Sequence, residues 1–386
     1  MGVFKAEPAK VQDWATRSVG AYWRAYDIQL AMYALLLAGL GLAMSYSSTV
    51  VTGVNPLDPS SNFLRGLMWS GIAVIVFTAA TVFDYKWLKT FAWPIYFVNL
   101  GLLGLSLVIG TGVGGAACWI AIGPLQFQFS ELAKILMIVV LANYLAVRQD
   151  RLGSIRVILG ACVLMVPTWA LVMLQPDLGT SLVLAGILAG MLFMSGASMK
   201  WLGVLTGLVI AFIPFAWTYL LRDYQKQRLS SFLNPASDPQ GSGYQLLQSQ
   251  IAVGSGGLFG KGLTNGTQDT LAFLPVGDTD FAFARLAEEL GFIGALLVFV
   301  LFVVLLWRVL MAGYRSQDRF GTIFAAGIGS MILFQVIVNV GMVIGLLPIT
   351  GIPLPFITRG GASLISLAIG LGILQSINIR QAKAEW

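Results

Sequence analysis

One short segment of this chain concentrates charged side chains directly before a long apolar run. The segment is FLPVGDTDFAFARLAEELGF, residues 273–292, in a chain of which only 10% of the residues are charged. Its carboxylates and its one arginine are Asp278, Asp280, Arg285, Glu288 and Glu289. The sequence contains no histidine, the most common general acid or base near neutral pH. A reaction that needs a proton acceptor would therefore use a carboxylate, a cysteine, a lysine or a tyrosine.

Two interpretations stay open for Asp280. If a helix begins near it, the residue lies at the N-terminus, where an aspartate often caps the free amides. An acid next to a membrane span is, equally, often functional. Arg285 with Glu288 or Glu289 has the i+3 or i+4 spacing of a helical ion pair. Asp278 follows a proline and a glycine, so it fits a turn.

Other charges interrupt apolar segments and have structural explanations of their own. Glu131 and Lys134 in SELAKIL are three residues apart, so they can pair on one helix face. Asp177 in QPDLGT fits an N-cap. Arg359 in ITRGG precedes the last apolar run, where it can bind an anion beside free helix amides.

The composition identifies a membrane protein. Hydrophobic residues make up 57% of the 386 residues, against about 45–50% in soluble domains. The mean hydropathy is +0.82. In such a chain the net charge of +6 reports loop topology and not a nucleic-acid partner. Two cysteines are too few for a disulfide framework.

The apolar runs predict an all-α fold with ten membrane-spanning helices. A span needs about 20 mainly apolar residues. The ten segments are 28–46, 64–83, 92–109, 131–147, 157–174, 179–195, 201–221, 290–308, 321–346 and 363–379. A long outer loop, residues 222–289, separates the seventh span from the eighth. Its apolar pieces favour an ordered cap over the outer mouth.

Basic residues indicate that both termini are cytoplasmic. With that orientation, inner segments carry fifteen of the 23 lysines and arginines, and short outer loops carry two. We expect a cytoplasmic or interfacial segment (1–27), a membrane domain (28–379) and a cytoplasmic tail (380–386). Within the first, residues 11–26 interleave aromatic and basic residues, which predicts a helix in the headgroup layer; a disordered basic tail is the alternative.

The outer segments predict a cavity that opens outward. They are the glycine-rich 110–130, QPDLG at 175–179, the long loop 222–289, and 345–364 with three prolines. Irregular backbone at membrane depth is tolerated only where protein or a water-filled cavity surrounds it. Outer cations that could face such a cavity are Lys261, Arg222, Arg228 and Arg359.

Five stretches resemble the SEDS family (shape, elongation, division and sporulation), and the TGIPLPF wording is closer to its RodA branch than to its FtsW branch. The stretches are GAACWIAIGPLQFQFSELAKI (115–135), QPDLGTSLV (175–183), YQLLQSQIAVGSGGLFGKGLTNGTQ (244–268), FLPVGDTDFAFARLAEELGFIG (273–294) and NVGMVIGLLPITGIPLPFITRGGASL (339–364). The resemblance implies a cell-wall polymerase that joins lipid II into peptidoglycan outside the cytoplasmic membrane during rod-shaped elongation.

The resemblance also implies partners and residue roles. The partners would be a class B penicillin-binding transpeptidase and other proteins of the elongation machinery. The family's essential aspartate falls on Asp280, and the tryptophan of its GA-x-x-W piece on Trp119. The chain departs from the family at Cys118, where a basic residue is common, at Arg359, usually tyrosine, and at Asp278, often histidine. A phosphate contact at position 118 is therefore not carried over, and Arg359 is the candidate to replace it.

The implied reaction needs a base, positive charge at the leaving pyrophosphate, and a groove for lipid tails. Asp280 is the predicted base. The predicted substrate-binding residues are Trp119, Lys261, Arg359, Arg222 and Arg228, and the predicted supporting residues are Glu289, Glu288, Arg285, Glu131 and Lys134. No motif has recognisable metal-binding spacing, so Mg²⁺ or Mn²⁺ stays an open alternative. The competing hypotheses are a lipid II flippase and a non-catalytic scaffold for the transpeptidase.

Overall fold

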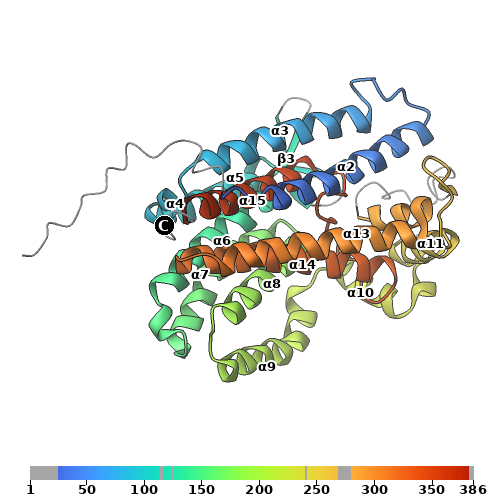
Figure 1. The fold of residues 1–386 in the computed structure, drawn as a ribbon. Coiled ribbons are helices and arrows are strands. Elements are labelled where there is room, and N and C mark those ends of the chain that lie inside the picture. Colours follow the sequence, from blue (N-terminus) through green and yellow to red (C-terminus); the bar gives the residue numbers. More distant parts are fainter. Residues whose placement is uncertain (1–24, 114–115, 123–124, 240, 268–279, 382–386) are drawn as a thin grey trace, which may run out of the picture.

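The computed structural model describes residues 25–113, 116–122, 125–239, 241–267 and 280–381. This part of the chain is a bundle of long helices with a small sheet and a cap (Figure 1). The long helices are α2 (Ile28–Val51), α3 (Asn62–Val82), α5 (Ala92–Ile109), α6 (Phe129–Val147), α7 (Ile155–Leu174), α8 (Leu178–Met194), α9 (Met199–Phe215), α13 (Ala282–Tyr314), α14 (Arg319–Val343) and α15 (Gly361–Gln381).

Each predicted span corresponds to one of these helices. Nine helices in the described residues are long and apolar enough to cross a membrane, and α8 is a shorter apolar helix of 17 residues. The chain is therefore a multi-pass membrane protein, as the composition predicted. Residues 11–24 lie outside the described residues, so the predicted interfacial helix over 11–26 stays a prediction.

Three helices, α6, α14 and α15, form the centre of the bundle, while α9 has no buried residue. Small residues let the central helices approach their neighbours closely. A Cβ at Gly190 of α8 would lie 2.0 Å from Oγ of Ser330 in α14. A Cβ at Gly372 of α15 would lie 2.7 Å from the carbonyl oxygen of Phe77 in α3. Larger side chains at these glycines would separate the helices.

Helix α13 is broken at Gly291, where φ is 68° and ψ is −169°. The turn 257–262 satisfies the backbone groups that the break exposes. The amides of Lys261 and Gly262 donate to the carbonyls of Glu288 and Glu289, at 3.0 and 2.9 Å. The amides of Phe292 and Ile293 donate to Gly257 and Leu258, at 2.9 and 3.1 Å. This clasp fixes the helical segment between Asp280 and the membrane span.

The long loop 222–289 forms helices in its described part, as its apolar pieces favoured, while its place over an outer mouth stays a prediction. It contains α10 (Asp223–Leu233), the short turn η4 (Pro235–Ser237) and α11 (Ser242–Ser255). Helix α11 lies against α13 and α14, and Oγ of Ser249 donates to the carbonyl of Val343 at 2.9 Å.

The sequence did not predict the small antiparallel sheet between α5 and α6. Its strands are β1 (Thr111–Val113), β2 (Ala116–Ile122) and β3 (Leu125–Gln128), in the order β1-β2-β3. Trp119 of β2 lies opposite Thr111 on one side and Gln128 on the other. The sheet leads directly into α6, so it places β3 beside the helix that begins at Phe129.

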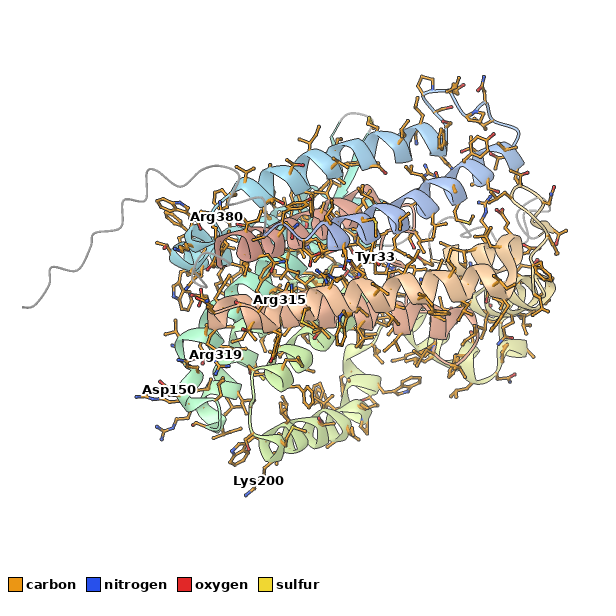
Figure 2. All side chains as sticks on the ribbon, viewed as in Figure 1. Tyr33, Asp150, Lys200, Arg315, Arg319 and Arg380 are labelled. Carbon is orange, nitrogen blue, oxygen red and sulfur yellow. The ribbon has the colours of Figure 1, made fainter. Side chains whose placement is uncertain are left out.

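Ion pairs tie the helices together at the other end of the bundle, where α15 ends and where Figure 2 shows Asp150, Arg319 and Arg380. Nε of Arg308 in α13 donates to Asp27 at 2.9 Å, and Asp27 also caps α2. Nζ of Lys89, in the short helix α4 (Lys86–Thr90), lies 2.7 Å from Asp318 before α14.

Candidate functional site

Asp280 lies immediately before α13 but does not cap it. The N-cap position is Phe281, and the Asp280 side chain makes no capping hydrogen bond. The capping interpretation of Asp280 is therefore wrong. Its backbone carbonyl accepts a hydrogen bond of 3.0 Å from Nδ2 of Asn339 in α14. Asp280 is a partly exposed residue, at the end of the bundle where Arg228 of α10 also lies.

Arg228 of α10 and the backbone at Gly351 face the Asp280 carboxylate. A Cβ at Gly351 would lie 3.4 Å from Oδ2 of Asp280 and 3.5 Å from Nη1 of Arg228. Burial raises the pKa of Asp280, and the negative charge of Asp177 raises this pKa further, while Arg228 opposes both. A raised pKa makes the carboxylate a stronger base, which suits proton abstraction.

Asp177 is a second acid beside this site and also the N-cap of α8. Its Oδ1 accepts from the Thr180 amide at 2.9 Å, which confirms the predicted cap. Its Oδ2 accepts from Nε2 of Gln128 at 2.9 Å and from Oγ of Ser130 at 3.0 Å. Asp177 therefore joins the end of β3 and the start of α6 to the start of α8.

Asn339 connects Asp280 to the proline-rich segment that follows α14. The Asn339 side chain is fully buried, and its Nδ2 donates to the carbonyl of Ile352 at 2.7 Å as well as to Asp280. Gly351 has a φ of 74°, which an L side chain rarely adopts. A Cβ at Gly179 would lie 2.9 Å from the Thr350 carbonyl oxygen, so α8 also approaches this segment closely.

Glu288 forms a buried network with the clasp. Its Oε1 accepts from Nζ of Lys261 at 2.7 Å, and from the amide and the hydroxyl of Thr267 at 2.9 and 2.7 Å. Nζ of Lys261 also donates to the Thr267 hydroxyl at 2.7 Å. Lys261, a predicted phosphate ligand, is thus already engaged in neutralising a buried acid.

Glu289 forms the predicted helical ion pair with Arg285. Nε of Arg285 lies 3.1 Å from Oε1 of Glu289, and both side chains are buried. The Ser47 hydroxyl of α2 donates to the same oxygen at 2.6 Å and accepts from the Thr264 amide at 2.9 Å. The pair therefore fixes α2, α13 and the outer cap together.

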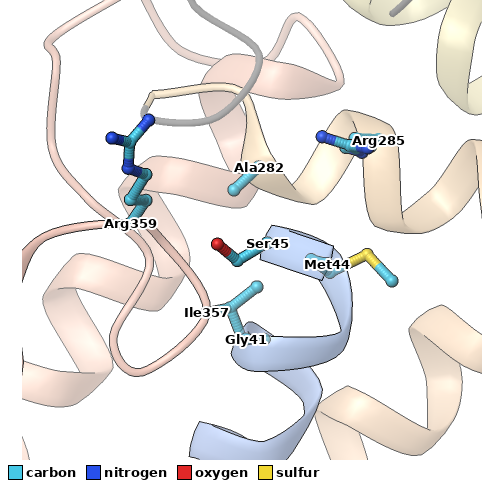
Figure 3. A pocket seen from close by; sticks show the side chains of 7 residues that line it. All are labelled: Gly41, Met44, Ser45, Ala282, Arg285, Ile357 and Arg359. Carbon is cyan, nitrogen blue, oxygen red and sulfur yellow. The ribbon is translucent and has the colours of Figure 1, made fainter. Parts of the chain in front are cut away.

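A small pocket adjoins Arg285 (Figure 3). Its volume of about 10 Å³ is enough for roughly one water molecule. It is lined by Gly41, Met44, Ser45, Ala282, Arg285, Ile357 and Arg359. Arg359 and Arg285 lie on opposite sides of Ser45 (Figure 3). Oγ of Ser45 is buried, and it has no hydrogen-bond partner within the described residues.

The remaining predicted residues lie in different places. Glu131 and Lys134 pair at 2.8 Å and are buried within α6, as their spacing predicted. Arg222 is exposed at the start of α10. Trp119 belongs to β2 and lies opposite Gln128, whose side chain donates to Asp177. The side chain of Trp119 and the whole of Asp278 lie outside the described residues. The described residues contain no cluster of three or more acids or cysteines that could hold a metal ion.

Residues 28–383 match the family model described as cell cycle protein, which covers FtsW, RodA and SpoVE. The chain belongs to this family. It is 40% identical to "Stage V sporulation protein E" of Bacillus subtilis, over 91% of this chain and 96% of that protein. It is 39% identical to "Peptidoglycan glycosyltransferase MrdB" of Escherichia coli, over 92% of this chain and 95% of that protein.

Two solved structures are also similar to this member of the FtsW/RodA/SpoVE family. The first, described as "Structural coordination of polymerization and crosslinking by a peptidoglycan synthase complex", has a TM-score of 0.77 and 29% identity, and the match covers 93% of this chain and 99% of that chain. The second is the Rod shape determining protein RodA of Thermus thermophilus, with a TM-score of 0.68, 29% identity, and 92% and 97% coverage. The resemblance drawn from the motifs is confirmed.

Sequence reasoning did not select three polar residues that the fold of this family member brings to Asp280: Asp177, Gln128 and Asn339. Asp177 and Gln128 lie in two of the quoted stretches, where Asp177 was interpreted only as a cap. Asn339 is the one asparagine in the apolar run 321–346, which is a signal for a buried polar contact. Their proximity depends on tertiary structure and not on spacing.

Proposed function

We propose that this protein is a peptidoglycan glycosyltransferase that polymerises lipid II on the outer face of the bacterial cytoplasmic membrane, for cell-wall elongation and rod shape. Both termini would be cytoplasmic. Membership of a family with relatives named peptidoglycan glycosyltransferase supports this activity. The observation that carries the site is the partly buried Asp280 carboxylate beside Arg228, at the outer ends of the helices.

Asp280 acts as the general base in the proposed reaction. A sugar hydroxyl of one lipid-linked disaccharide attacks the anomeric carbon of another lipid-linked chain. The new carbon–oxygen bond forms as the bond to the pyrophosphate breaks, and the hydroxyl proton moves to Asp280. The lipid pyrophosphate leaves with the bonding electron pair. One inverting displacement converts the α-linked donor into a β-linked product, so no covalent enzyme intermediate is needed.

The arginines nearest the reacting centre stabilise the leaving pyrophosphate. Arg228 faces Asp280 directly, and its guanidinium can bind phosphate oxygens in pairs. Arg359 contributes a second positive charge from the segment that precedes α15, at the pocket with Arg285 and Ser45. Lys261 has a different role in this scheme, because its ammonium keeps Glu288 neutralised and so stabilises the clasp.

Two further parts of the proposal concern Trp119 and the partner. Trp119 would contact substrate from the small sheet, whose strand β3 reaches Asp177 through Gln128. A class B penicillin-binding transpeptidase would crosslink the strands as they are made. The likeness to a chain of a peptidoglycan synthase complex, described as coordinating polymerization and crosslinking, supports a partner of this kind.

The proposal is tested with the full-length protein, its transpeptidase partner and labelled lipid II in detergent. Wild type should produce long glycan strands. Asp280→Asn keeps the shape of the side chain but removes the base, and the rate should fall by at least about a hundredfold. The matched control is Asp58→Asn, at an exposed aspartate of the loop between α2 and α3. Its rate should equal that of wild type.

The same variants separate the competing functions. A flippase would move labelled lipid II across vesicle membranes without forming strands. A scaffold would support full polymerisation by a partner even with Asp280→Asn. If a folded Asp280→Asn protein makes strands of normal length, Asp280 is not the general base. If neither wild type nor this variant makes strands, the protein is not a polymerase.

A further inference from the structure

A second pocket lies at the other end of the bundle, away from Asp280, and has no role in the proposed reaction. Its volume is about 310 Å³, within the range of small-molecule sites. Three turns line it: the short helix η2 (Gln149–Arg151) between α6 and α7, the turn after α8, and the start of α14. The pocket therefore lies where spans end, at the depth of lipid headgroups.

Two opposite charges line this pocket without pairing. Asp150 of η2 and Arg319 of α14 are both exposed, and Figure 2 shows them at this end of the bundle. Within the described residues, neither side chain makes a hydrogen bond or an ion pair. Gln149 also lines the pocket, and its side-chain amide is likewise without a described partner. A ligand that carries a negative and a positive group, separated by a few atoms, would satisfy both charges.

The rim of the pocket continues into a lipid-facing surface. Met194 lines the pocket at the end of α8 and is 50% exposed. Next to it, Phe193 is 57% exposed, and Met199 at the start of α9 is 64% exposed. Helix α9 has no fully buried residue, so much of its surface faces acyl chains in a membrane. A molecule with its polar group in the pocket would have its apolar part beside these three side chains.

We propose that this pocket binds the headgroup of a phospholipid with a phosphate and a primary amine, which is phosphatidylethanolamine. The Arg319 guanidinium would hold the phosphate, because arginine binds phosphate oxygens in pairs. The Asp150 carboxylate would accept hydrogen bonds from the ammonium, and the Gln149 amide would donate to the phosphate. The acyl chains would follow Phe193 and Met199 into the bilayer.

Asp150 is the residue that favours this lipid over other lipids. Purely basic pockets on the inner side of membrane proteins select anionic lipids. Phosphatidylglycerol would fit Arg319 but would leave Asp150 against a headgroup without a positive charge. Phosphatidylcholine carries the positive charge but has no N–H group to donate to the carboxylate. The structure therefore predicts an order of affinity, and each lipid tests one contact.

The experiment is a titration of the full-length purified protein with phosphatidylethanolamine, phosphatidylcholine and phosphatidylglycerol, with bound lipid counted by native mass spectrometry. Wild type should retain one phosphatidylethanolamine with at least about five-fold preference. Arg319→Gln should weaken binding of all three lipids about five-fold. Asp150→Asn should weaken phosphatidylethanolamine about five-fold and should not weaken phosphatidylglycerol. Arg315→Gln, an exposed cation just after α13 that does not line the pocket, is the matched control and should bind as wild type does.

Each alternative outcome contradicts the proposal. Equal retention of the three lipids by wild type would show that the pocket does not distinguish between their headgroups. Loss of phosphatidylethanolamine in the Arg315→Gln control would assign binding to general surface charge. Competition by inorganic phosphate as strong as that by the lipid would identify a phosphate site that needs no acyl chain. For Asp150→Asn the ratio between two lipids is measured within one sample, so partial unfolding does not mimic the expected change; for Arg319→Gln, an unchanged melting temperature separates lost binding from unfolding.

Discussion

Gly291→Ala should open the clasp between α13 and the outer turn 257–262. With φ 68° and ψ −169°, Gly291 occupies a backbone region that essentially only glycine adopts. An added Cβ would lie 2.2 Å from the amide nitrogen of Gly260 and 2.7 Å from the carbonyl oxygen of Leu258. Both neighbours are backbone atoms, so no side-chain rotation relieves the contact. The alanine is accommodated only if the turn moves away.

The expected cost follows from these two effects. The unfavourable dihedral angles cost about 1–3 kcal/mol. Moving the turn breaks some of the four backbone hydrogen bonds that join it to α13, at about 1 kcal/mol each. A total of roughly 3 kcal/mol corresponds to more than a hundredfold increase in the open population. Because Lys261 lies in this turn, its contact with Glu288 is lost at the same time.

Limited trypsin digestion measures this opening directly. Cleavage after Lys261 requires the turn to leave α13, so its rate should rise by up to about a hundredfold in Gly291→Ala, and the melting temperature in detergent should fall. Gly101→Ala is the matched control, because a Cβ at Gly101 in α5 meets nothing within 4 Å. That variant should be neutral or slightly stabilised. If Gly291→Ala resists trypsin as well as wild type does, the clasp does not constrain α13.

Four further predictions concern the surroundings of Asp280. Arg228→Gln removes the charge that lowers the pKa of Asp280, so the fall of the polymerisation rate on the acid side should move to higher pH. Asp177→Asn removes a charge that raises this pKa and keeps a good cap, so the same fall should move to lower pH. For either variant, a pH–rate profile that shifts the opposite way contradicts its prediction. Asn339→Leu leaves two buried carbonyls without their donor, which should cost about 2–4 kcal/mol by thermal unfolding and lower the rate; an unchanged melting temperature would refute this. Gly351→Ala should cost about 1–2 kcal/mol for its left-handed backbone and slow polymerisation by shifting the backbone that faces Asp280 and Arg228, so a wild-type initial rate would contradict it.

The spans were predictable because hydropathy is a local property of the chain. Each of the ten apolar segments became one helix, and the apolar piece YQLLQSQIAVG of the long loop became part of α11, which packs on α13 and α14. The break at Gly291 was not predictable in the same way. A glycine disfavours a helix but does not by itself fix where the helix breaks, and the turn 257–262, distant in sequence, makes the break at Gly291 favourable. The sheet after α5 was missed because its strands are short and interrupted by glycines.

The site was predictable only in part. Asp280 stood out because acids are rare in this chain, and the pairs Arg285–Glu289 and Glu131–Lys134 followed from helical spacing. The proximity of Asp177 to Asp280 depends on how α8 and α13 meet, which no spacing within one element reports. The ion pair between Lys261 and Glu288 also depends on how separate elements meet. Because the Lys261 charge neutralises Glu288, its role differs from the predicted phosphate contact.

The four acids near the proposed site differ in whether the lone pairs of their carboxylates are available. This difference distinguishes the proposed general base from the acids that only stabilise the fold. Glu288 and Glu289 are buried beside cations at 2.7 and 3.1 Å, so substrate has no access to them. Asp177 uses both oxygens for hydrogen bonds to its own fold. Asp280 is held through its backbone carbonyl, and among these four acids it is the one whose carboxylate forms no ion pair or hydrogen bond within the described residues. A general base must be held in place and still have a free lone pair, and Asp280 is the acid in this group that meets both conditions.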